Sequence, residues 1–177
     1  MTVHVMTEGQ ADARLLLGLL RDFDDAALRV SSVGGRSMAE SMAEKVLITT
    51  GEPVVLVVDA DGTDPDEVAE DKASVESFLR PAAGPVPFEV VLVVPEMEAL
   101  LFEAPSMLKR LFGVADLPRM RTKRPKAVLR SLDGSPTLAD VMAKLGADDW
   151  QALRETPTGR RIRAAVREVA RRVPRVV

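Results

Sequence analysis

Residues 54–62, Val-Val-Leu-Val-Val-Asp-Ala-Asp-Gly, constrain the fold of this chain more than any other stretch. Five consecutive apolar residues, most of them β-branched, are typical of a short strand that is buried on both faces of a sheet. The run ends at two carboxylates, Asp59 and Asp61. Side chains two residues apart on a strand point the same way, so these acids should repel each other unless a cation lies between them. The alternative is a solvated acidic turn.

Apolar runs alternate with helical patterns along the first part of the chain. Strands are expected at residues 2–6, 28–33, 54–58 and 88–94, and helices at 11–21, 37–48 and 64–79. This alternation predicts an α/β fold with a mostly parallel four-stranded sheet, helices on both faces, and residues 54–58 in its interior. We expect residues 1–104 to form this core. Residues 105–177 should form a helical, basic extension on the same domain, ending in an amphipathic helix at 158–172.

Composition excludes several classes of protein. The chain has no cysteine, which rules out a thiolate metal site and a cysteine nucleophile. Its one histidine, His4, falls within the first expected strand, so we expect a hydrogen-bonded structural histidine and no Ser-His-Asp triad. No apolar run is long enough to cross a membrane, and no signal peptide is visible. We therefore expect a cytoplasmic protein that does not enter a membrane.

Charge is distributed very unevenly along the chain. Residues 1–104 hold 20 Asp and Glu against 7 Lys and Arg, whereas residues 105–177 hold 17 Lys and Arg against 7 Asp and Glu. An acidic half suits a cation and a basic half suits a polyanion, although the two halves could simply neutralise each other in the fold. Helical spacing predicts nucleic-acid binding by four arginines of the last helix: Arg160, Arg161, Arg163 and Arg167.

Acidic pairs follow three of the four expected strands. In an open parallel sheet, binding sites collect at the carboxyl ends of the strands. Those ends deliver Glu8 and Asp12 after the first strand, Asp59 and Asp61 after the third, and Glu96 and Glu98 after the fourth. Carboxylate oxygens are the ligands that hard cations prefer, so this pattern predicts a site for one or two Mg²⁺ or Mn²⁺ ions.

The order of these motifs resembles the Toprim domain of topoisomerases, primases, small ribosomal RNA maturases and overcoming-lysogenization-defect (OLD) nucleases. The resemblance rests on Glu-Gly-x-x-Asp at residues 8–12, Asp-x-Asp at 59–61 and the Gly34-Gly35 step, and it covers residues 2–104. The segment Pro-Glu-Met-Glu-Ala-Leu-Leu-Phe at 95–102 is similar to the OLD-like branch and to small stand-alone Toprim-related proteins. This resemblance implies a Rossmann-like Toprim fold.

The resemblance also implies a function and a set of site residues. OLD-type enzymes are metal-dependent nucleases, so the chain is expected to hydrolyse DNA or RNA, in phage defence or DNA repair. The matching metal-binding acids are Glu8, Asp12, Asp59, Asp61 and Glu98, with Glu96 as a further candidate ligand. Lys126 stands where those enzymes place a lysine that stabilises the reacting phosphate, and Glu8 could serve as general base or acid. These residues show no match to the ATPase module of the family, so we expect any ATP dependence to come from a separate partner chain.

Two other functions compete with the nuclease. Asp-Ala-Asp-Gly-Thr at residues 59–63 also matches the nucleophile motif of haloacid-dehalogenase-like phosphatases, with Asp59 attacking and Asp61 as general acid. Asp148-Asp149 would then be the later acidic pair, but no apolar strand precedes it. The other alternative is a non-catalytic Toprim-like module that binds a partner or nucleic acid.

Overall fold

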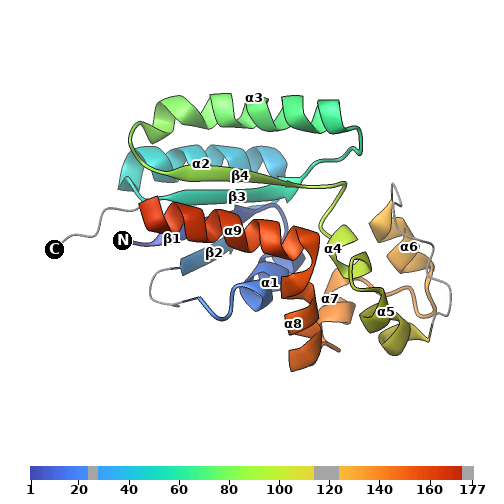
Figure 1. Cartoon of the computed structure of the whole chain (residues 1–177). Helices are drawn as coiled ribbons and strands as arrows, with labels where there is room; N and C mark the ends of the chain where they lie inside the picture. Colours follow the sequence, from blue (N-terminus) through green and yellow to red (C-terminus); the bar gives the residue numbers. More distant parts are fainter. Residues whose placement is uncertain (24–27, 114–123, 173–177) are drawn as a thin grey trace.

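The computed structural model describes residues 1–23, 28–113 and 124–172 of the chain (Figure 1). Four strands form one sheet, and every neighbouring pair is parallel. The sheet order is β2-β1-β3-β4, with β1 at Val3–Thr7, β2 at Leu28–Ser32, β3 at Val54–Asp59 and β4 at Phe88–Val93. The expected α/β class, the parallel four-stranded sheet and the interior place of the 54–58 strand are all confirmed.

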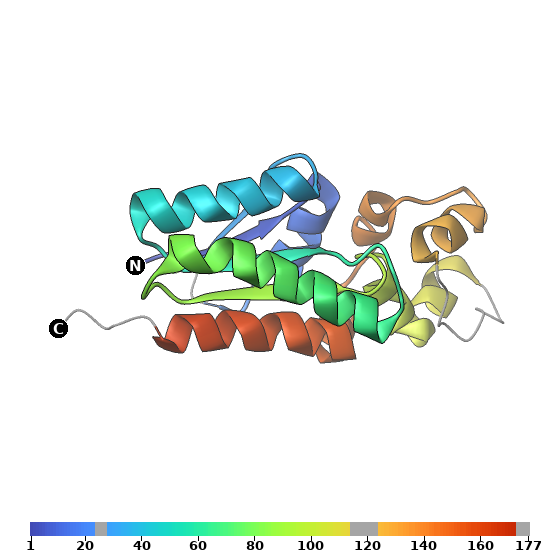
Figure 2. The same cartoon turned by 90° about the horizontal axis from the view of Figure 1, so that it is seen from above.

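Two helical layers enclose the sheet (Figures 1 and 2). Helices α1 (Gln10–Leu19) and α9 (Pro157–Arg172) pack on one face, and α2 (Arg36–Thr50) and α3 (Pro65–Ala83) pack on the other. Strand β3 contributes side chains to the core on both faces of the sheet, because alternate side chains of a strand point to opposite faces. Val55 and Val57 belong to the cluster beneath α1 and α9, whereas Leu56 and Val58 belong to the cluster beneath α2 and α3.

Shorter helices gather beyond the carboxyl end of the sheet (Figure 1). They are α4 (Ala99–Phe102), α5 (Pro105–Phe112), α6 (Pro125–Ser131), α7 (Leu138–Met142) and α8 (Ala147–Glu155). The chain then returns through α9, whose Ile162, Val166 and Val169 are fully buried in the same cluster as α1. The last helix is therefore a layer of the main core. It is not an appendage.

The ends of α3 illustrate how local chemistry sets helix length. The expected start is confirmed: the Asp64 carboxylate accepts hydrogen bonds from the N–H groups of Asp66 and Glu67, at 2.9 and 3.3 Å. The expected end near residue 79 is wrong, because the helix continues through Pro81 to Ala83. Pro81 lies in the last turn of α3, so the hydrogen bond that its missing N–H removes is at the end of the helix, with only two helical residues beyond it. The turn beyond begins at Gly84, whose φ is 52°.

Two sequence features have structural roles that keep them out of a site. His4 is buried, and its Nε2 lies 2.6 Å from Glu52, as expected of a structural histidine. Trp150 packs directly on Gly18 of α1, where an added Cβ would lie 2.2 Å from the indole ring. Among the described residues, no helix combines the length and the apolar character needed to cross a membrane.

Candidate functional site

The site is built from the loops that follow β1, β3 and β4 at the carboxyl edge of the sheet. Asp59 is the last residue of β3, and Glu8 lies one residue beyond β1. The turn after β3 is tied to the turn after β4, because the N–H groups of Ala60 and Asp61 both donate to the carbonyl of Pro95, at 3.1 and 2.9 Å. The parallel sheet thus brings together three loops that are far apart in the sequence.

Backbone N–H groups orient three of the expected carboxylates. Glu8 Oε1 accepts from the N–H of Asp59 at 3.0 Å, and Asp59 Oδ1 accepts from the N–H of Met97 at 2.8 Å. Asp12 Oδ2 accepts from the N–H of Gly9 at 3.0 Å, which explains the Glu-Gly-x-x-Asp spacing, because an added Cβ at Gly9 would lie 2.8 Å from that oxygen. Each carboxylate uses one oxygen in this way and keeps its second oxygen for another partner.

Asp59 lies at the electrostatic centre of these acids. Its pKa is raised to about 8, first by burial and then by the nearby carboxylates of Asp12, Glu8 and Glu98, against the lowering effect of the Met97 N–H. A carboxylate that raises the pKa of Asp59 by like-charge repulsion must be near it, because salt at 0.1 M screens exposed charges that are more than about 10 Å apart. The structure therefore brings four of the sequence-predicted acids into one electrostatic cluster, which we call the acidic cluster: Glu8, Asp12, Asp59 and Glu98.

The other members of the acidic cluster behave in the same way. Burial raises the pKa of Glu8, and repulsion from Asp61 and Asp12 adds to it. Burial also raises the pKa of Asp12 and of Glu98, while the ammonium of Lys126 opposes the rise in both. Buried like charges without a cation favour protonation, so each carboxyl in the cluster holds its proton to higher pH than a solvated acid.

Asp61 and Lys126 lie at the rim of the acidic cluster. Asp61 is exposed, and its φ of 56° is in the left-handed region, which Asp tolerates better than most residues. Lys126 is exposed at the start of α6, and its Nζ lies 4.0 Å from Oε1 of the buried Glu98. Helix α6 therefore brings Lys126 next to Glu98, although the two residues are far apart in the sequence.

Glu96 has a different environment from the other candidate ligands. Its Oε1 accepts the N–H of Lys126 at 2.6 Å, so it fixes the first turn of α6 against the loop after β4. This contact gives Glu96 a structural role, and its part in metal binding stays a prediction. Asp149, weighed as part of a phosphatase pair, caps α8 through the N–H of Gly146 and forms an ion pair with Arg110. The hydrogen-bond and ion-pair partners of Asp149 therefore lie outside the acidic cluster.

The acidic cluster is not a preformed metal cage. Within residues 1–23, 28–113 and 124–172, no three His, Asp or Glu side chains are grouped so that they could hold a metal ion. The backbone hydrogen bonds described above hold the carboxylates in place, and repulsion between them favours separation. The predicted Mg²⁺ or Mn²⁺ site would therefore require the free oxygens to converge on the ion, with water completing its coordination.

Arg36 is a site residue that the sequence did not indicate. Its guanidinium donates to the backbone carbonyl of Asp59 at 3.2 Å and forms ion pairs with Glu40 and Asp71, at 2.9 and 2.5 Å. It therefore connects the end of β3 to α2 and α3. The preceding Gly34 and Gly35 donate their N–H groups to the carbonyl of Glu8, at 2.9 and 3.1 Å, which agrees with a tight turn.

The arginines of α9 divide into buried and exposed groups. Arg163 is 7% exposed and is bound to both carboxylate oxygens of Asp22, at 2.5 and 2.6 Å. Its charge is therefore paired inside the fold, and its role in nucleic-acid binding stays a prediction. Arg161 donates to the carbonyl of Leu92 at 2.8 Å, and Arg167 lies over the ring of Phe23. Arg160 and Arg167 are exposed, and their binding to nucleic acid stays a prediction.

Thr7, which directly precedes Glu8, has an unpaired hydroxyl. The residue is 1% exposed, and no described residue forms a hydrogen bond with its Oγ1. A buried polar atom without a partner costs about 1–3 kcal/mol. We expect Thr7→Val, which keeps the shape, to raise the free energy of unfolding of the metal-free protein by about 1 kcal/mol in urea titrations. A loss of stability in Thr7→Val would mean that the hydroxyl has a partner such as bound water.

Comparisons with known proteins leave the family of this chain unassigned. No protein-family model matches the chain, and no characterised protein matches its sequence. Among solved structures, the C-terminal region of the OLD protein from Xanthomonas campestris pv. campestris is similar over 98% of this chain and 88% of that one, with 20% identity and a TM-score of 0.40. A TM-score of this size does not establish a shared fold.

Proposed function

We propose that this chain is a divalent-metal-dependent nuclease of Toprim and OLD-like type, which hydrolyses phosphodiester bonds in DNA or RNA. The observation that supports this most is the acidic cluster itself. Four carboxyl groups from three loops repel one another at the carboxyl edge of a parallel sheet, and Asp59 is affected by all the others. Such a cluster weakens a fold that lacks a cation, so a binding role accounts for it better than a structural one.

The donor set fits a hard cation. Glu8, Asp12, Asp59 and Glu98 would hold Mg²⁺ or Mn²⁺ through oxygen atoms alone, with Asp61 and Glu96 as outer candidates. A bound divalent cation would supply a nucleophile at neutral pH and neutralise charge on the phosphate. Hydrolysis of this kind requires a water molecule to lose a proton, so a nearby carboxyl group that can accept or donate a proton is useful. Glu8, with its raised pKa, is the candidate general base or acid.

The positive charge of Lys126 would bind the phosphate. Its ammonium is exposed and lies beside the buried Glu98, so it could contact both a carboxylate of the cluster and a non-bridging phosphate oxygen. The exposed Arg160 and Arg167 would add sequence-independent contacts to the nucleic-acid backbone. A separate ATPase chain would be needed only if cleavage depends on ATP.

Cleavage assays test this function. We expect Mn²⁺-dependent cleavage of supercoiled DNA or of single-stranded RNA, abolished by EDTA. Lys126→Ala should reduce the rate about a hundredfold, because one preorganised charge on the transition state is lost. Arg130→Ala is the matched control, since Arg130 is an exposed cation on the same helix.

The results separate the competing functions. Equal rates for Lys126→Ala and Arg130→Ala would remove Lys126 from the reaction. Metal binding without cleavage of any nucleic acid would indicate a non-catalytic module. A covalent phosphate trapped on Asp59 would indicate a phosphatase.

A further inference from the structure

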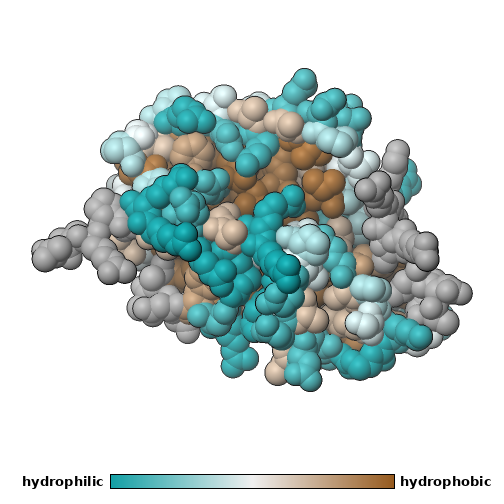
Figure 3. Space-filling model, in the orientation of Figure 1, coloured by the Kyte–Doolittle hydropathy of each residue, from teal (hydrophilic) through white to brown (hydrophobic). Residues whose placement is uncertain are grey.

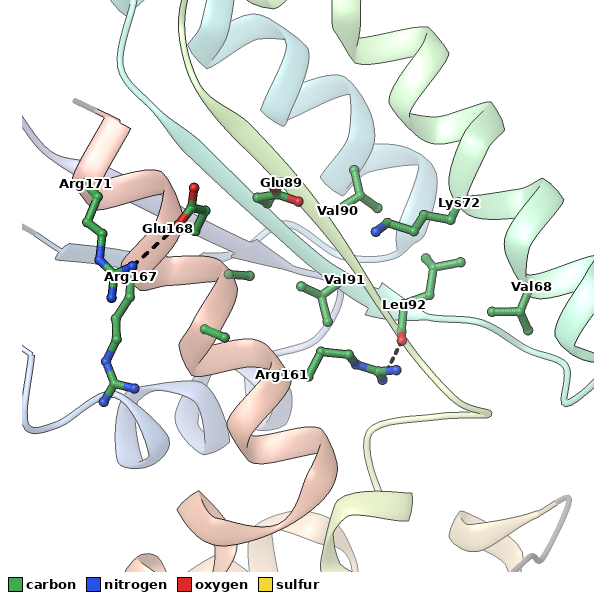
Figure 4. Close-up of a pocket in the computed structure, with 12 residues that line it drawn as sticks. Val68, Lys72, Glu89, Val90, Val91, Leu92, Arg161, Arg167, Glu168 and Arg171 are labelled. Atoms are coloured by element: carbon green, nitrogen blue, oxygen red, sulfur yellow. Dashed lines mark hydrogen bonds and ion pairs between the residues drawn. The ribbon is translucent and has the colours of Figure 1, made fainter. Parts of the chain in front are cut away.

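The open edge of the sheet carries a groove that contains no member of the acidic cluster, although Arg161 and Arg167, two of the arginines predicted to bind nucleic acid, line it. Strand β4 is an edge strand, flanked by α3 on one face of the sheet and α9 on the other. Between these helices lies a hollow of about 570 Å³, whose lining includes Val68, Val90 and Leu92. Figure 3 shows an apolar region there, bordered by hydrophilic side chains, and Figure 4 shows the lining residues.

Peptide groups of β4 point into this groove. The carbonyls of Pro87 and Val93 accept hydrogen bonds from Val54 and Ala60, on the β3 side. Because the direction of peptide groups alternates along a strand, those of Val90 and Leu92 face the open edge. The carbonyl of Leu92 accepts from Arg161 at 2.8 Å, whereas no described residue pairs with the N–H or C=O of Val90. Val90 is 1% exposed, so its peptide groups are also poorly hydrated.

The charges around the groove are not balanced. Glu89 and Glu168, its two acids, already form ion pairs with Arg172. Lys72 and Arg161 extend toward β4 from the two helices (Figure 4), and Lys72 also forms an ion pair with Glu76 of its own helix at 3.4 Å. Arg161 forms no ion pair with any described carboxylate, and its guanidinium occupies the place that an N–H of a neighbouring strand would take. The groove therefore combines an unpaired strand edge with the uncompensated positive charge of Arg161.

We propose that this groove binds an extended, acidic segment of a partner protein, which adds a strand to the edge of β4. The partner backbone would pair with Val90 and replace Arg161 at the carbonyl of Leu92. Arg161, displaced outward, would then pair with a carboxylate of the segment. The apolar floor of the groove would accept alternate side chains that point toward the sheet.

Other occupants fit these features less well. Nucleic acid also carries negative charge, but the groove has no aromatic side chain on which a base could stack, and its floor is apolar. A nucleic-acid strand also has no peptide groups that could pair with both the N–H and the C=O of Val90. A second copy of β4 would bring only one acid, Glu89, which is already paired with Arg172. An acidic peptide satisfies both the strand edge and the charge.

Selection from a display library of short random peptides tests this inference on the full chain. We expect enrichment of sequences that alternate apolar residues with Asp and Glu. A synthetic peptide of the selected sequence should bind about tenfold more weakly, or worse, to Arg161→Glu. Lys45→Glu is the charge-matched control, since Lys45 is exposed on α2 away from the groove. Binding should slow hydrogen exchange at the amide of Val90, which a side-chain contact alone would not do.

Several results would overturn the inference. The selected peptides could show no enrichment of Asp and Glu, or the peptide could bind wild type and Arg161→Glu equally well. Peptide binding could also leave hydrogen exchange at the Val90 amide unchanged. Displacement of the peptide by a single-stranded oligonucleotide with the same dependence on Arg161 would make nucleic acid the occupant. Asp59→Asn should bind the peptide as wild type does, so a failure here is distinguishable from a failure of the nuclease proposal.

Discussion

Asp59→Asn is expected to abolish nuclease activity, remove the stabilisation of the fold by Mn²⁺, and make the metal-free protein more stable at neutral pH. Asparagine keeps an oxygen that can accept the N–H of Met97, which Asp59 accepts at 2.8 Å. It removes the negative charge, which faces repulsion from Asp12, Glu8 and Glu98. We expect about a thousandfold loss of cleavage rate, because an anionic ligand at the centre of the cluster is lost.

The opposite directions of these effects distinguish a binding site from a structural ion cluster. A ligand that binds only the folded state at a hundred times its Kd stabilises the fold by about 2.7 kcal/mol. Thermal melts of wild type should show this gain with Mn²⁺, and melts of Asp59→Asn should not. Asp133→Asn is the matched control, because Asp133 is an exposed acid outside the cluster. An Asp59→Asn protein that still responds to Mn²⁺ would show that Asp59 is not a ligand.

The sheet and the acidic loops were predictable because their determinants are local. The run at residues 54–58 is apolar at every position, which only an interior strand with two covered faces accommodates. Parallel strands place their carboxyl ends at one edge, so the topology alone gathers Glu8, Asp59 and Glu98. The start of α3 was equally visible, because Asp64 and Pro65 have well-defined effects at a helix terminus.

Long-range pairing decides the features that the sequence did not predict. Arg163 belongs to a basic helix in the sequence, but its charge is neutralised by Asp22, 141 residues away. Arg36 was not predicted as a site residue, because its partner Asp71 lies on a different helix. Glu96 and Glu98 look equivalent in the sequence, but the carboxylate of Glu96 accepts a hydrogen bond from the N–H of Lys126 at the start of α6. Helical spacing identifies which residues share a face, but it does not reveal which of them meet a partner.

A buried acid with a raised pKa also predicts an unusual dependence of stability on pH. The pKa of Asp59 is about 8 in the folded protein and near 3.8 when unfolded. Between these values the folded state binds more protons than the unfolded state, so stability is highest at low pH and falls as pH rises toward 8. Most acids have the opposite effect. The hydrogen bond from Arg163 lowers the pKa of Asp22 to about 2, so the stability that Asp22 contributes to the fold is lost only as the pH falls below about 4.

We therefore expect the metal-free protein to lose about 1–3 kcal/mol of unfolding free energy between pH 5 and pH 8. Urea titrations in EDTA, compared for wild type and Asp59→Asn at each pH, report the contribution of Asp59 together with its repulsion from Asp12, Glu8 and Glu98. The two should be similar near pH 5, and the variant should be the more stable near pH 8. Parallel pH profiles would mean that Asp59 is ionised at little cost in the folded protein. In that case the four carboxyl groups would not be close enough to need a cation.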